Sequence, residues 1–441
     1  MTMTAHNHFE QLPPELLLPI LTSLPTLESL HNLLRASPAA FRLFNPHGAE
    51  IFEAVLSSGA IHDYTCGLIR VAALVRSSSL PPQAHNLLTF RHFVRYESTS
   101  HRYDPPAWTL PPLRLSSDVS PSTLRGLLAT HRKVACLVIS CLRFYLIRFK
   151  PLRPSHLVDE SFHFESGYHG SDGLYIAAWQ QKPEEKPFPV HDIGPPTWVE
   201  EQRVLRAFWR LQLFRDLKVA GTKALLVNWP DTDLQRLNFM TAPNFHDVPT
   251  RNLIEEDREP SIRTRGTVLE HQLINSVVEY EDEDKQTIVS PDFLQTRREW
   301  PDPVEGEKDW DAVSCYSSTT YDFFYMVREG EHEHISDGLC SPLQHVSFRP
   351  FRRLGFAIWC TQRMLGYGLL EGEWGPIMDP SDLFPRESVY LAWRSILGED
   401  EIAQVERRNQ EAFAWANKPE SEDEESDRSR FSSPFLSERT F

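Results

Sequence analysis

Two histidines, an aspartate and a cysteine lie close together in the segment EHEHISDGLC and could bind a metal ion. They are His332, His334, Asp337 and Cys340. Imidazole and thiolate are ligands that zinc prefers, but this spacing matches no common structural or catalytic zinc site, and no second cysteine–histidine pair lies nearby. A solvated polar loop accounts better for the segment. We therefore expect no metal site and no cofactor.

A second segment, ESGYHGSDGLY, contains Gly167, Gly170 and Gly173. It lacks the lysine and the spacing of a phosphate-binding loop, so turn formation is a sufficient explanation. Neither GxSxG nor HExxH occurs in the chain. Dispersed serine, histidine and aspartate residues leave a catalytic triad open in principle, but no pattern singles one out. We expect no catalytic residues and no enzyme activity.

Composition narrows the possible partners. The chain has 441 residues and a formal net charge of −16, which argues against nucleic acid and anionic membrane surfaces as partners. Its six cysteines are scattered and form no CxxC pair, a pattern typical of reduced thiols. The start of the chain does not resemble a signal peptide, and the most apolar run is interrupted by Arg143 and Arg148. These features predict a location in the cytoplasm or nucleus.

Short helices are predicted throughout the first fifty-six residues, after a loose tail at 1–8. Leucines spaced by three and four predict a first helix from Pro14 to about Ser23, with Pro19 as an awkward residue inside it. Thr26 can cap a second helix. Ser37 followed by Pro38 is a clean start for a third, which we expect to end at Asn45-Pro46 before an apolar segment at 51–56.

The rest of the chain predicts a large, irregular and mainly helical domain over 57–418. Ser120-Pro121 starts a long, mostly apolar helix, and Thr197 with Glu200 forms a capping box for a helix reaching Lys218. Arg203, Arg206 and Arg210 form a basic stripe on that helix, best explained as a solvated face or as partners of acidic loops. An acidic insert is expected near 243–312 and a disordered, acidic, serine-rich tail at 419–441. Other helices are expected at 61–75, 84–96, 268–278, 351–365, 386–397 and 399–416, and one short strand or helix at 174–180.

The segment 9–56 resembles an F-box, the helical module that docks substrate adaptors on the Skp subunit of SCF ubiquitin ligases. The match rests on residue type and spacing, with Pro19 and Pro38 as departures. It comprises Leu12-Pro13, Glu15-Leu16-Leu17, Ile20-Leu21, Leu24-Pro25, Leu30, Leu33-Leu34, Ala36-Ser37 and Phe41. The whole chain also resembles the F-box-like proteins of filamentous fungi, with weaker support from 200–217, 350–359 and 390–397.

This resemblance implies a mainly α fold, with an N-terminal three-helix F-box-like bundle followed by the irregular helical domain. It implies a substrate adaptor that docks on Skp and recruits a protein target through the region after about residue 60, without bond chemistry of its own. The residues expected to contact Skp are Leu12, Pro13, Leu16, Leu17, Ile20, Leu21, Leu24 and Leu30.

Three alternatives remain open from the sequence. The leucines could serve only the internal helical core of this chain. The module could bind partners outside a ubiquitin ligase, or the large domain could hold an unrecognised enzyme site. The sequence contains no substrate-binding repeat, so the target is not predicted.

Overall fold

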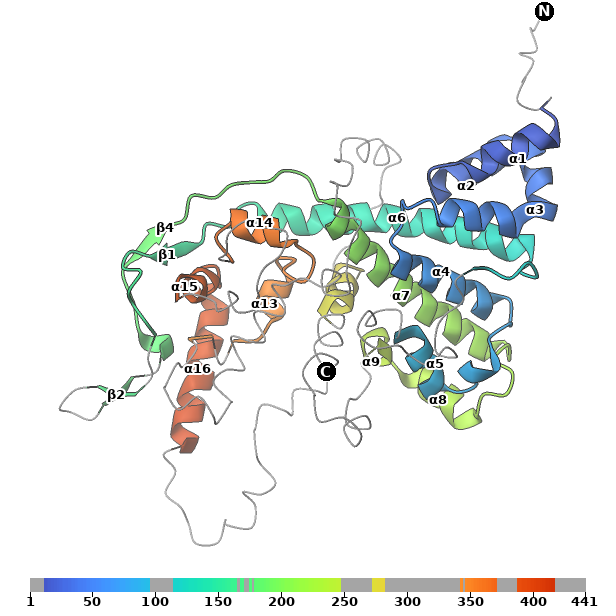
Figure 1. Ribbon diagram of the computed structural model, residues 1–441. Coiled ribbons are helices and arrows are strands. Elements are labelled where there is room, and N and C mark those ends of the chain that lie inside the picture. Colours follow the sequence, from blue (N-terminus) through green and yellow to red (C-terminus); the bar gives the residue numbers. More distant parts are fainter. Residues whose placement is uncertain are drawn as a thin grey trace, which may run out of the picture.

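The computed structural model describes residues 12–95, 114–164, 167–169, 174–176, 178–246, 272–281, 342–343, 346–370 and 387–416. Helices dominate these residues, as predicted (Figure 1). Several predictions fall outside them: the histidine-rich segment at 332–340, Gly170 and Gly173, most of the acidic insert, and the tails at 1–8 and 419–441.

Three helices begin the described chain: α1 (Pro14–Thr22), α2 (Leu27–Ala36) and α3 (Pro38–Leu56). Their starts follow from local chemistry. Thr26 and Ser37 accept the backbone N–H groups of Ser29 and Ala40, and proline stands at the first position of α1 and α3, where its missing donor costs nothing. Both α1 and α2 pack on α3, and α2 and α3 pack on α6.

The predicted end of the third helix at Asn45-Pro46 falls at a kink, where two helical stretches meet within α3. The helix continues to Leu56, with a break at His47, whose φ and ψ are −111° and 16°. The missing donor of Pro46 therefore kinks the helix without ending it. Packing explains the continuation, because Ile51, Phe52, Val55 and Leu56 are all buried in the core.

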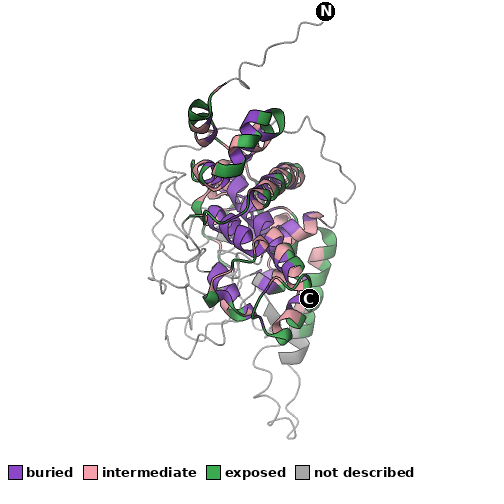
Figure 2. Ribbon diagram, turned by 90° about the vertical axis from the view of Figure 1, so that its right-hand side faces the viewer, coloured by how far each residue is buried: buried purple, intermediate pink, exposed green. Residues whose placement is uncertain are grey.

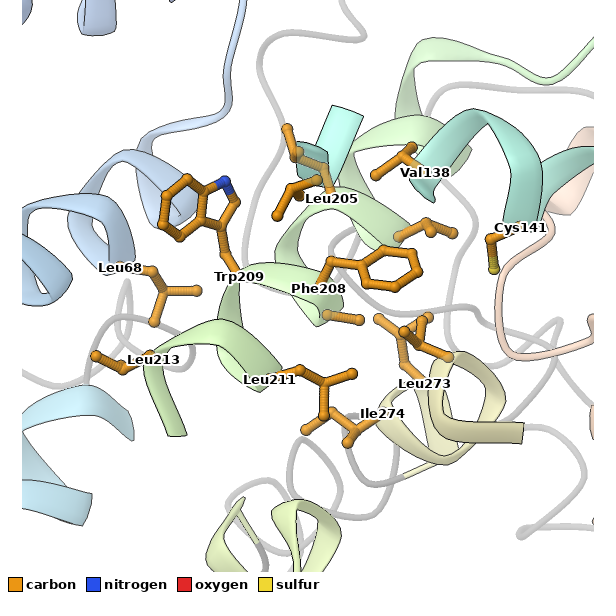
Figure 3. Packing of buried hydrophobic residues seen from close by; sticks show 14 of the residues in the cluster. Leu68, Val138, Cys141, Leu205, Phe208, Trp209, Leu211, Leu213, Leu273 and Ile274 are labelled. Atoms are coloured by element: carbon orange, nitrogen blue, oxygen red, sulfur yellow. The ribbon is translucent and has the colours of Figure 1, made fainter. Parts of the chain in front are cut away.

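Two long helices form the centre of the molecule: α6 (Pro121–Phe149) and α7 (Trp198–Thr222). Ser120 caps α6, and Thr197 and Glu200 complete the predicted capping box of α7. α7 packs on α6 and on α4 (Asp63–Arg76). In Figure 3, Trp209 of α7 points towards α4, whereas Phe208 lies between α6 and the helical residues 272–281. Apolar side chains on several sides of α7 are buried for this reason, whereas Val219 near its end is 49% exposed.

Shorter elements surround these two helices. α5 (Leu87–Arg95), preceded by a 3₁₀ turn at Pro82–Ala84, packs with α8 (Asp231–Phe239) and α9 (Ala242–His246) near one end of α7. The remaining helices are α13 (Arg349–Arg352), α14 (Thr361–Gly366), α15 (Glu387–Ser395) and α16 (Glu399–Ala416). The predicted helix over 351–365 is thus divided. Gly355 has a φ of +83° between its two parts, and a Cβ there would lie 2.8 Å from the Trp359 ring, so only glycine fits.

The segment 151–196 holds more β-structure than predicted. β1 (Ser155–Leu157) pairs antiparallel with β4 (Glu185–Pro187), and β2 (Gly167–His169) pairs antiparallel with β3 (Leu174–Ile176). A 3₁₀ turn at Ala178–Gln180 follows β3. These strands have three residues each, too few for a period-two pattern to be recognised in the sequence.

One continuous hydrophobic core connects the first helix with the last. It includes Leu21 of α1, Phe44 of α3, Leu124 of α6, Trp209 of α7 and Val405 of α16. Buried residues gather in the middle of the molecule, and exposed residues line the outward sides of the helices (Figure 2). Within the described residues, no helix is both long enough and apolar enough to cross a membrane.

Candidate partner-binding surface

α1 has one side in the core and one side in solvent. Pro13 precedes the helix, and its carbonyl accepts the N–H groups of Leu16 and Leu17. The helix continues through Pro19 to Thr22. Leu17 and Leu21, four residues apart, are 2% and 0% exposed. This inward pair attaches α1 to α3.

The opposite side of α1 presents apolar side chains to solvent. Leu16 is 54% exposed and Ile20 is 37% exposed, and their spacing of four residues places them on one helical face. Pro13 is exposed just before the helix. We call Pro13, Leu16 and Ile20 the outward face of α1. Single exposed leucines are common on protein surfaces, but grouped apolar side chains are a typical sign of a binding site.

The eight residues predicted to contact a partner therefore fall into three groups. Pro13, Leu16 and Ile20 are exposed; Leu12 and Leu24 are half-buried; Leu17, Leu21 and Leu30 are buried. The buried three close the core between α1, α2 and α3, because a helix with leucines on several sides must turn some of them inward. Only the exposed and half-buried residues offer surface to a partner in this conformation.

Phe41 of α3 is a further exposed apolar residue, absent from the predicted contact set. Its ring is 39% exposed, and the Arg125 guanidinium of α6 lies over it at 4.8 Å from the centroid. The Nη1 of Arg125 also donates to Asn45 Oδ1 at 2.6 Å. Phe41 belongs to the sequence pattern described above, so the pattern itself could have identified it.

Two polar connections attach the N-terminal helices to the rest of the molecule. His131 of α6 is 3% exposed. Its Nδ1 accepts the indole N–H of Trp209, and its Nε2 lies 2.9 Å from Glu28 Oε1. Since Nδ1 accepts, Nε2 carries the hydrogen and donates a hydrogen bond to Glu28. This chain joins α2, α6 and α7.

The second connection centres on Glu53 of α3. Its carboxylate accepts two hydrogen bonds from the Nε and Nη2 of Arg70 in α4, and one from the N–H of Leu115. Burial opposes ionisation of Glu53, but the hydrogen bonds from Arg70 and Leu115 outweigh it and lower the pKa of the carboxyl group. Both connections join the N-terminal helices to the helices that follow them.

The most concentrated group of charged side chains, at the start of α7, has a structural role. Glu200 and Arg363 are fully buried and form two hydrogen bonds of 2.9 Å with each other. The other lone pairs of Glu200 accept the N–H groups of Thr197 and Cys360. Arg363 also donates to the carbonyls of Gly194 and Pro195.

No oxygen of Glu200 remains available to a substrate, because each already accepts two hydrogen bonds. Burial raises the pKa of the neighbouring Cys360 thiol to about 12, so the thiol stays protonated and is a poor nucleophile. The pair of Glu200 and Arg363 therefore joins α7 to α14 and to the residues just before α7. No group of three potential metal-binding side chains occurs among the described residues.

Of the two explanations offered by the sequence for the arginine stripe on α7, the solvated face was wrong. Arg203, Arg206 and Arg210 are only 4%, 4% and 2% exposed. Arg203 donates to the carbonyls of Ile358 and Trp359, and the Arg206 guanidinium lies 5.4 Å from the centroid of the Tyr64 ring. Neighbouring segments cover the stripe, so these arginines serve the interior of the protein.

Comparisons with known proteins add no family or fold assignment. No family model matches the chain, and neither curated proteins nor solved structures give a significant match.

Proposed function

We propose that the protein is an F-box-type substrate adaptor, which docks on the Skp subunit of a ubiquitin ligase and recruits a protein target. The observation that carries the proposal is the division of α1 into a buried face at Leu17 and Leu21 and an outward face at Pro13, Leu16 and Ile20. A helix that served only the internal core would not need apolar groups on both sides.

The energetics of the outward face fit a docking surface. Covering a Leu or Ile side chain that is about half exposed contributes on the order of 1 kcal/mol, half the value of a full transfer from water. Leu12 and Leu24 add partly exposed apolar area beside this face. Such gains must exceed the entropic cost of association, which a rigid surface keeps small.

The attachment of α1–α3 to the large domain also supports the adaptor role. An adaptor must hold its target at a fixed position relative to the ligase. The His131–Glu28 and Glu53–Arg70 pairs, together with the shared core, provide that rigidity. The region after about residue 60 would select the target, and the protein would act in the cytoplasm or nucleus.

The proposal assigns no bond chemistry to the chain. The charged group at Glu200 and Arg363 is fully occupied by internal hydrogen bonds, which supports a binding role more than an enzymatic one. The alternative of an F-box-shaped interaction protein outside the ligase uses the same outward face. The two roles differ in whether the Skp complex then recruits cullin.

Reconstitution of the ligase separates these roles. We expect the full chain to form a complex with Skp, to recruit cullin through it, and to lose both with Leu12→Ala and Pro13→Ala combined. The circular dichroism melting curve of this variant should match the wild type. Complex formation with Skp but not with cullin would support the interaction protein instead. Undiminished Skp binding by the double variant would overturn the proposed docking surface.

A further inference from the structure

α2 and α3 both pack against α6 (Figure 1), and arginines lie on α2 and α6 at this contact: Arg35 on α2, and Arg125 and Arg132 on α6. α6 has 29 residues with five lysines or arginines and no acidic residue, in a chain whose net charge is −16. Arg125 and Arg132 are seven residues apart, about two helical turns, and so project from the same side of α6 roughly 10 Å apart along its axis. We call Arg35, Arg125 and Arg132 the basic seam.

Arg125 is held in place by neutral groups of α3. The Phe41 ring lies under its guanidinium at 4.8 Å, and Asn45 Oδ1 accepts from its Nη1 at 2.6 Å. Stacking fixes the plane of the guanidinium without neutralising its charge. A planar, fixed guanidinium loses little entropy on binding an anion, and its remaining N–H groups match the two oxygens of a carboxylate.

The Arg132 end of the seam is also positive. Arg35 of α2 is exposed, and Arg132 is partly exposed. Both act on His31 of α2: burial first, then the charges of Arg132 and Arg35, lower the pKa of its imidazole. Glu28 of α2 acts on His31 in the opposite sense, and the neutral His131 ring binds its carboxylate without cancelling the negative charge. Two arginines against one carboxylate leave this end of the seam net positive. The two cationic positions, Arg125 and the pair Arg35 and Arg132, therefore follow each other along α6.

We propose that the basic seam binds an acidic peptide segment of a protein partner, with one carboxylate at Arg125 and another at Arg35 and Arg132. An extended peptide rises about 3.3 Å per residue, so acidic residues about three positions apart span the distance between the two arginines of α6. A short acidic segment is attracted by this local positive charge. A long nucleic acid would also be repelled by the net negative charge of the rest of the chain, so the peptide is the favoured partner.

This inference does not depend on Skp docking, because the seam lies against α6 and uses none of the outward face of α1. The test uses the full chain and a fluorescent Gly/Ser peptide of roughly twelve residues with glutamate at every third position. We expect saturable binding by fluorescence anisotropy that weakens as sodium chloride is added. A peptide with glutamine in place of glutamate should not bind.

Charge reversal locates the site. Arg132→Glu should weaken peptide binding by about tenfold or more, because an attractive contact becomes repulsive. Lys223→Glu makes the same charge change at the exposed end of α7 and should alter binding by less than about twofold. Phe41→Leu keeps every charge but removes the stacked ring, and should weaken binding to an intermediate degree.

Arg132 is partly exposed, so its variant is expected to fold, and an unchanged melting curve would verify this. Equal binding by Arg132→Glu and Lys223→Glu would overturn the proposal. Equal binding of the glutamine peptide, no binding by the wild type, or displacement of the peptide by lower concentrations of single-stranded RNA would overturn it as well.

Discussion

The outward face of α1 and the start of α7 arrange their side chains in opposite ways. At α1, apolar Leu16 and Ile20 are exposed to water. At the start of α7, charged Glu200 and Arg363 are buried with no exposed surface. Each arrangement is costly if it stands alone, since exposed apolar area and buried charge are both unfavourable.

The difference lies in whether the cost is compensated within the chain. Glu200 and Arg363 satisfy each other and nearby backbone groups, so the group is complete. The outward face of α1 has no comparable cover among the described residues, as the exposure of Leu16 and Ile20 shows. A complete group is what a structural role requires, whereas an uncovered apolar face is what the proposed docking role requires.

The largest expected effect comes from breaking the buried pair. Arg363→Met should lower the free energy of unfolding by about 3–5 kcal/mol, because Glu200 would remain charged and buried without its partner. Urea denaturation measures this. Arg353→Met makes the same substitution at an exposed position and should change stability by less than about 0.5 kcal/mol. Similar losses in the two variants would show that the buried pair has no special structural role.

The two faces of α1 should respond differently to the same substitution. Leu21→Ala removes a fully buried side chain and should cost about 2–5 kcal/mol of stability. Leu16→Ala should cost about 0.5 kcal/mol or less, because the side chain is 54% exposed. Denaturation of both variants under one condition makes the comparison. Equal losses would mean that Leu16 is covered by the chain in solution, and the outward face would not exist.

Local sequence signals predicted the starts of helices well. The capping residues Thr26, Ser37 and Ser120, and the box of Thr197 with Glu200, act within three residues and are seen as expected. Such signals depend on backbone groups near in sequence, so no tertiary information is needed. Pro46 marked the kink at His47, but the second helical stretch of α3 depends on apolar packing further along the chain and was not predicted.

What covers a helix face could not be predicted in the same way. The spacing of Arg203, Arg206 and Arg210 correctly groups them on one face of α7, but the covering groups near 358 and 359 lie about 150 residues away. Arg363 and Glu200 are similarly distant in sequence. For α1, periodicity identified the apolar positions without distinguishing buried Leu17 from exposed Leu16.

Isothermal titration calorimetry of Skp into the full chain is the most direct test of the proposed docking surface. We expect one-to-one binding with a negative heat-capacity change, the signature of apolar burial. Leu16→Ala combined with Ile20→Ala should weaken binding roughly thirtyfold, for a loss of about 2 kcal/mol. Leu88→Ala combined with Ile147→Ala deletes a Leu and an Ile elsewhere that are 50% and 71% exposed, and should leave the affinity unchanged. Failure of the wild type to bind Skp, or equal affinities of the two double variants, would show that the outward face of α1 is not a Skp-docking surface.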